Sequence, residues 1–96
     1  MTGYAWVITR DRIDGGMENG TVGSWKAALS AAEIRSSEGG ERFSMYDDDG
    51  NCCYEGIFVG DDDATGFEPL KDFGIPNAGC TEIRYRNPNT GKMERL

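Results

Sequence analysis

The sequence predicts a single α+β domain, in which an antiparallel sheet of four or five strands has one main helix packed on one face. Three observations lead to this fold class. Several segments alternate apolar and polar residues with the period of a strand, one segment has the spacing of a helix, and turns rich in glycine or aspartate separate them. With 38% hydrophobic content, the chain has enough apolar surface for one modest core. We therefore expect residues 1–96 to form one domain.

The first strand and the main helix are expected in the N-terminal half. Residues 4–13, YAWVITRDRI, divide aromatic and β-branched side chains between two faces, as in a strand. Residues 14–23 contain four glycines among polar residues, which is typical of a loop. The helix is expected to begin after Ser24 as N-cap and to end at the pair Gly39-Gly40. Its sheet-facing side chains are expected to be Trp25, Leu29 and Ile34.

The second half predicts a hairpin and two further strands. Residues 42–46 and 51–60 have strand patterns on either side of the turn DDDGN, and an Asp-Gly pair favours such a turn because it needs positive φ. Residues 67–79 contain two prolines and are expected to form at most one helical turn before a loop. Residues 80–87 alternate again, and residues 92–96 are expected to form a short closing strand.

The charge is unevenly distributed along the chain. The net charge is −7, with a pI of about 4.4, which argues against direct binding to nucleic acid or anionic membranes and favours a basic partner. Residues 41–75 hold ten acidic residues against Arg42 and Lys71, a balance of −8, whereas residues 76–96 have a balance of +2. The middle of the chain therefore carries the excess negative charge.

The composition excludes most catalytic and metal chemistry. There is no histidine, which removes the usual general base and the commonest zinc ligand. The three cysteines are an odd number in a sequence without secretion features, so free thiols are expected. Cys52 and Cys53 point to opposite faces of their strand and would not converge on one metal ion. Cys80 could lie near one of them. No phosphate-binding glycine motif occurs and no pair of carboxylates is selected by spacing, so we expect neither an enzyme nor a cofactor.

Calcium is the obvious ligand to test for the aspartates, but the spacing does not fit. With Gly50 at position six of an EF-hand loop, Met45 falls at position one and Gly56 at position twelve, where acidic ligands are required. We therefore expect no metal site. Three alternatives remain open, namely a non-standard calcium site between the two aspartate loops, solvated turns, and a negative surface that meets a positive one.

Two stretches, RFSMYDDDGNCCYEG and FEPLKDFGIPNAGCTEIRYR, resemble a family of small acidic proteins encoded by bacteriophages and bacterial mobile elements. The resemblance covers residues 4–85 and includes the segments YAWVITRD, YDDDG, YEG and PNAGCT. These segments are fold markers, and no catalytic residue is carried over. Proteins of this kind include anti-CRISPR and anti-restriction inhibitors, some of which imitate DNA, so the resemblance implies an inhibitor.

The leading hypothesis is an inhibitor of a bacterial DNA-targeting defence complex, most specifically a CRISPR effector, acting in the host cytosol. Its acidic side chains would occupy a basic DNA channel, because rows of carboxylates can imitate the phosphates of a duplex. The acidic candidates are Asp47, Asp48, Asp49, Glu55, Asp61, Asp62, Asp63, Glu68 and Asp72, and the aromatic candidates are Tyr46, Tyr54 and Phe67. Arg84 and Arg86 are expected to lie away from this surface.

An alternative hypothesis is a bacterial accessory domain whose acidic loops bind calcium or only keep the protein soluble. Position beside a helix-turn-helix regulator in a prophage would favour the inhibitor. The segment MTGYAWVITRDR lacks the features of a signal peptide, and no apolar run is long enough for a membrane span, so we expect a cytoplasmic protein that is a monomer or weak dimer.

Overall fold

The computed structural model describes residues 4–13, 17–18, 20–25, 30–37, 40–60, 66–87 and 89–96. The elements follow in the order β1 (Tyr4–Asp11), β2 (Met17–Glu18), β3 (Val22–Trp25), α1 (Ala31–Arg35), β4 (Glu41–Tyr46), β5 (Cys52–Gly60), a π-helical turn η2 (Leu70–Gly74), α2 (Ile75–Ala78), β6 (Glu82–Arg86) and β7 (Met93–Arg95). The fold is α+β, as the alternation of strand and helix patterns predicts.

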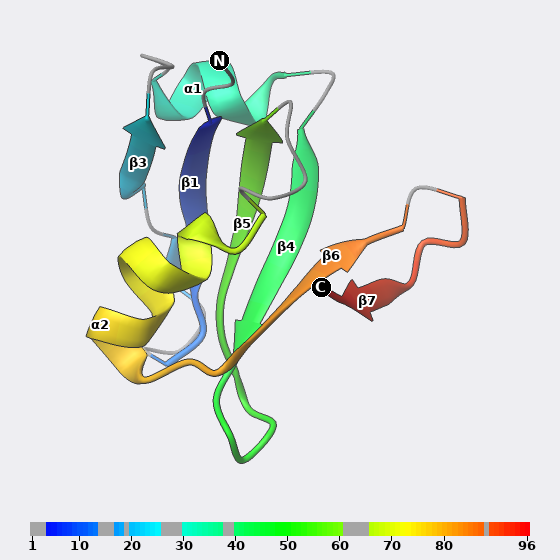
Figure 1. The fold of residues 1–96 in the computed structure, drawn as a ribbon. Helices are drawn as coiled ribbons and strands as arrows, with labels where there is room; N and C mark the ends of the chain where they lie inside the picture. Colours follow the sequence, from blue (N-terminus) through cyan, green and yellow to red (C-terminus); the bar gives the residue numbers. More distant parts are fainter. Residues whose placement is uncertain are drawn as a thin grey trace.

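The described strands form one antiparallel sheet (Figure 1). Its order is β2-β1-β5-β4-β6-β7, and β3 pairs with β1 beside β2. The five strands expected from the sequence are all present, including the hairpin of β4 and β5. The sheet is larger than the expected four or five strands because β2 and β3 extend it along the outer edge of β1.

These two additional strands fall in a segment that we expected to be a loop and, at Ser24 and Trp25, the start of the helix. The glycine at position 23 is needed for packing, because an added Cβ would lie 2.2 Å from the indole ring of Trp6. β3 pairs Gly23 with Trp6 across the two strands, so the indole covers the bare backbone. A glycine in this strand therefore marks a close approach of an aromatic ring and not a flexible turn.

The helix α1 begins six residues later than expected. Ser24 lies in β3, and the N-cap is Ser30, whose hydroxyl accepts from the backbone N–H of Glu33 at 3.2 Å while the Glu33 carboxylate accepts from the backbone N–H of Ser30. This reciprocal capping box needs an acidic or amide residue at the third helical position. The corresponding position after Ser24 is alanine. Ser30 is consequently the stronger start signal.

The packing expected for the main helix is only partly observed. Ile34 is buried against β1 and β5, as expected. Trp25 belongs to β3 rather than to the helix, and Leu29 lies outside the described residues.

The second helical region was expected to end after one turn, and that prediction is wrong. The backbone N–H of Ile75 donates to the carbonyl of Leu70, five residues earlier, so η2 runs directly into α2. Pro76 is the second residue of α2 and follows the π turn directly. Gly79, with φ of 64°, ends the helix. The wider π turn places both prolines at tolerated positions.

Helical segments cover both faces of the sheet, so the prediction of one helix on one face is also corrected. On one face, η2 and α2 cover a core that includes Trp6, Phe43, Phe58 and Ile83. On the other face, Ile34 of α1 packs on Ala5 and Val7. Successive side chains of β1 point to opposite faces of the sheet, so this strand contributes residues to both cores. Among the described residues, no helix has the length and apolar character that crossing a membrane requires.

Gly56, at the centre of β5, is the position where we expect the fold to be least tolerant of a methyl group. An added Cβ would lie 2.4 Å from both the Phe43 ring and the carbonyl oxygen of Val7. Gly56→Ala should lower the free energy of unfolding by about 1–3 kcal/mol through overpacking. Gly20→Ala is the control, because its Cβ would meet no atom within 4 Å. Urea denaturation of both variants tests this, and equal stability would contradict it.

Candidate functional site

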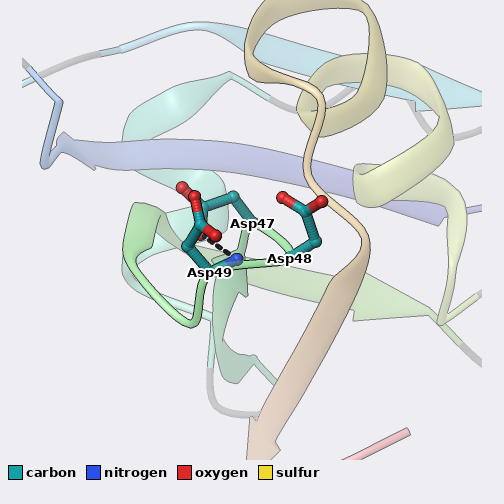
Figure 2. Close-up of side chains that lie close together, drawn as sticks. All are labelled: Asp47, Asp48 and Asp49. Carbon is teal, nitrogen blue, oxygen red and sulfur yellow. Dashed lines mark hydrogen bonds between the residues drawn. The ribbon is translucent and has the colours of Figure 1, made fainter.

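The acidic turn between β4 and β5 projects from one end of the sheet, opposite the end covered by α1 (Figure 1). We call residues 47–50 the hairpin tip. The carboxylate of Asp47 is turned into the loop, where Oδ1 accepts from the backbone N–H of Asp49 at 3.0 Å (Figure 2). The same oxygen accepts from the backbone N–H of Asn51 at 2.9 Å. Gly50 supplies the positive φ, 83°, that the turn needs. Asp47 therefore closes the turn, and the exposed Asp48 and Asp49 are not needed for that purpose.

The other described acidic candidates have local partners. Glu55 on β5 forms an ion pair with Arg12, at 3.3 Å, and Glu68 forms one with Lys71, at 3.8 Å. These pairs neutralise part of the negative charge that the sequence concentrates in residues 41–75. Asp61, Asp62 and Asp63 lie outside the described residues.

Asp72 has a structural role that its place in the sequence does not suggest. One carboxylate oxygen accepts from the Tyr4 hydroxyl at 3.0 Å and from the Trp6 indole N–H at 3.4 Å. Because both donors are on β1, the carboxylate fastens η2 to the sheet. Burial, and then the hydrogen bond and negative charge of Asp72, raise the pKa of Tyr4 to about 12.

The three aromatic candidates differ in accessibility. Tyr54 is only 5% exposed and packs edge-on against Phe73 with ring centroids 4.7 Å apart, so it belongs to the core and cannot contact a partner. Tyr46 is half-buried, and the guanidinium of Arg84 lies 4.2 Å from its ring centroid. Phe67 is exposed. Tyr46 and Phe67 therefore remain available at the surface.

The expectation that Arg84 lies away from the acidic residues is wrong. Its guanidinium stacks on Tyr46, the residue before the hairpin tip, and pairs with the carboxylate of Glu82. Glu82 also pairs with Arg95, at 3.5 Å. The pairing of β6 with β4, which places Glu82 opposite Tyr46, brings the basic C-terminal region beside the hairpin.

The cysteines form no nucleophilic or metal-binding cluster in the described part of the chain. All three are free thiols, as expected, and Cys53 and Cys80 are buried. Burial, together with a hydrogen bond to Cys53, raises the pKa of Cys80 to about 12. The Cys80 thiol is consequently a poor nucleophile at neutral pH.

Sequence reasoning missed an open pocket of about 400 Å³ on the sheet face that carries α1. We call it the arginine pocket because Arg10, Arg35, Arg42 and Arg86 line it. They come from β1, α1, β4 and β6, so their convergence depends on strand order. Counting charge along the chain could not reveal it, since Arg42 falls in the most acidic segment.

Comparison with known proteins found no match: no protein-family model, no curated protein and no solved structure is similar to this chain.

The hairpin tip gathers three carboxylates, whose nearest oxygens lie within 4.8 Å of one another. We expect that it does not hold calcium, because Asp47 is committed to two backbone N–H groups and a calcium site needs six or more oxygen ligands. EDTA and calcium should both leave the melting temperature unchanged. Thermal unfolding monitored by circular dichroism tests this, with magnesium as the ionic-strength control. A rise of several degrees with calcium alone would contradict it.

The Tyr4–Asp72 contact predicts a loss of stability at alkaline pH. The unfolded chain releases the phenolic proton near pH 10, whereas the folded protein holds it until about pH 12, so stability falls as pH rises through this interval. Asp72→Asn removes the negative charge that helps to raise the pKa of Tyr4. This variant should therefore have a lower Tyr4 pKa and lose less stability at alkaline pH. Urea unfolding from pH 8 to 11, with NMR titration of the Tyr4 ring, measures both. Asp49→Asn is the control, and an Asp72→Asn profile identical to it would contradict the prediction.

Proposed function

We propose that the protein is a non-enzymatic binding module that engages a basic surface through the hairpin tip. The observation that carries the proposal is the exposure of Asp48 and Asp49, which are adjacent at the projecting end of the sheet and make no side-chain hydrogen bond or ion pair within the described residues. Unpaired adjacent charges repel each other and favour an oppositely charged partner. Glu41 is similarly unpaired, but it lies at the other end of β4.

The proposed partner is a basic DNA-binding surface in a bacterial DNA-targeting defence complex, with a CRISPR effector as the most specific candidate. The net charge of −7 and the resemblance to small acidic phage proteins support this choice. Asp61, Asp62 and Asp63 are proposed to add to the same recognition. The protein would act in the bacterial cytoplasm, without a cofactor.

Other acidic residues make contacts within the protein, and these contacts limit which residues can be tested as part of the binding surface. Charge reversal at Glu55 or Asp72 would break an ion pair or the fastening of η2, so a loss of binding there would not identify a contact. Tyr46 and Phe67 are the proposed aromatic contacts, since Tyr54 is in the core.

The alternative accessory-domain hypothesis also has one supporting observation. Asp47 accepts two backbone hydrogen bonds, as turn-forming aspartates commonly do. In that case the aspartates of the tip would serve only the turn and solubility, and capture of a partner would not depend on Asp48 or Asp49.

Charge reversal at the hairpin tip should weaken binding by about tenfold or more, mainly through a slower on-rate, because several charges act together on a complementary channel. The experiment is capture of the partner from a bacterial lysate, followed by competition between the protein and labelled target DNA for the purified complex. Asp48→Lys/Asp49→Lys is compared with Glu41→Lys/Glu94→Lys, which changes the net charge equally at other exposed positions. Reversal of Asp61, Asp62 and Asp63, which changes the local balance from −8 to −2, should also abolish binding.

Competition by the wild-type protein should fall steeply as salt rises from about 50 to 200 mM, as DNA binding does. If DNA stays bound while the protein binds, the DNA-mimic mechanism is wrong. If no DNA-targeting complex is captured, the inhibitor proposal is wrong.

A further inference from the structure

The arginine pocket concentrates positive charge on an acidic protein. Four of the seven arginines of the chain line it, and neither lysine of the described residues does. Among the described residues, Glu55 is the one acidic residue of the lining, and its carboxylate is paired with Arg12 at 3.3 Å. The described lining therefore holds more basic than acidic side chains, although the whole chain has a charge of −7.

Two of the arginines lack partners. Arg42 and Arg86 make no hydrogen bond or ion pair within the described residues, and Arg86 is exposed, as is Arg42. They flank Phe43 and Tyr85, which are directly paired across β4 and β6, so the ladder brings the two guanidinium groups to the same sheet face. Like charges on neighbouring strands are destabilising. An anion between them would remove this repulsion.

A polar side chain on the pocket floor is also without a partner. Ser44 is 8% exposed and lines the pocket, and its hydroxyl makes no hydrogen bond within the described residues. Because no side-chain oxygen or nitrogen of the described residues is buried without a hydrogen-bond partner, this hydroxyl is accessible from the pocket. The Ser44 hydroxyl is thus a third donor beside the two guanidinium groups.

We propose that the arginine pocket binds a small organic phosphate. Guanidinium groups match the oxygens of a phosphate in a bidentate way that an ammonium group does not, which fits a lining with arginines and no lysine. Arg42 and Arg86 bind the phosphate oxygens, and Ser44 donates a further hydrogen bond. The volume of about 400 Å³ exceeds that of a phosphate ion, and the half-buried Ile57 and Met93 in the lining contact the organic part of the ligand.

The experiment measures binding of inorganic pyrophosphate and of AMP by isothermal titration calorimetry at constant ionic strength. Arg42→Gln/Arg86→Gln should weaken the binding of both probes by about tenfold or more, because each charge-assisted hydrogen bond contributes strongly. Lys92→Gln/Arg95→Gln removes the same charge from exposed side chains outside the pocket and should change binding by less than about twofold. AMP should also bind more tightly than inorganic phosphate measured in the same way, because the apolar lining contacts its organic part.

Two further measurements separate a ligand site from a structural role. Without ligand, Arg42→Gln/Arg86→Gln should be at least as resistant to urea as the wild type, because it relieves repulsion. In NMR spectra of the wild type, pyrophosphate should shift the side-chain Nε–H signals of Arg42 and Arg86 and leave that of Arg95 unchanged.

Several outcomes would overturn the proposal. One is that neither pyrophosphate nor AMP binds at about 10 mM, a concentration at which even a site with a millimolar dissociation constant is mostly filled. Another is an equal loss of affinity in both double variants. A third is self-association at low salt that Asp48→Lys/Asp49→Lys abolishes and phosphate does not reverse, which would make the hairpin tip of a second copy the occupant.

Discussion

The antiparallel pairing of β5 with β1 on one side and β4 on the other is the constraint on which the rest of the structure depends. Because successive side chains of a strand point to opposite faces, each central strand must serve two different environments. In β5, Phe58 enters the aromatic core beneath η2, whereas Glu55 and Ile57 face the arginine pocket. At Gly56 the strand has no room for a side chain, because the Phe43 ring of β4 and the Val7 carbonyl of β1 occupy the place of a Cβ.

Both candidate surfaces follow from this pairing. The hairpin that joins β4 to β5 carries the unpaired aspartates away from the body of the sheet, and the strand order β1-β5-β4-β6 gathers arginines on one face. The aspartates of the hairpin tip and the arginines of the pocket thus lie on different parts of the sheet. A net charge of −7 describes the whole chain but neither surface by itself.

Local patterns predicted the elements that depend on local physics. Period-two alternation and the Asp-Gly turn were sufficient for β1, the β4–β5 hairpin and β6. Features that depend on distant residues were not predictable. Gly23 looks like a loop residue in the sequence, but in the fold the Trp6 ring packs over it. The prolines near η2 look like helix breakers, but a π turn allows the helical region to continue. Among the site residues, Asp48 and Asp49 follow from the sequence, whereas the burial of Tyr54 and the convergence of Arg42 with Arg86 require the tertiary fold.

Within the hairpin tip, different residues form the turn and carry the exposed charge, and this affects how the protein can evolve. Asp47 alone fixes the turn through its backbone contacts, with Gly50 providing the required φ. The side chains of Asp48 and Asp49 are not needed for the turn. Acidic, neutral or basic side chains can therefore replace one another there over generations with little loss of stability. Selection can therefore retune the electrostatics of this end of the molecule while the scaffold stays constant.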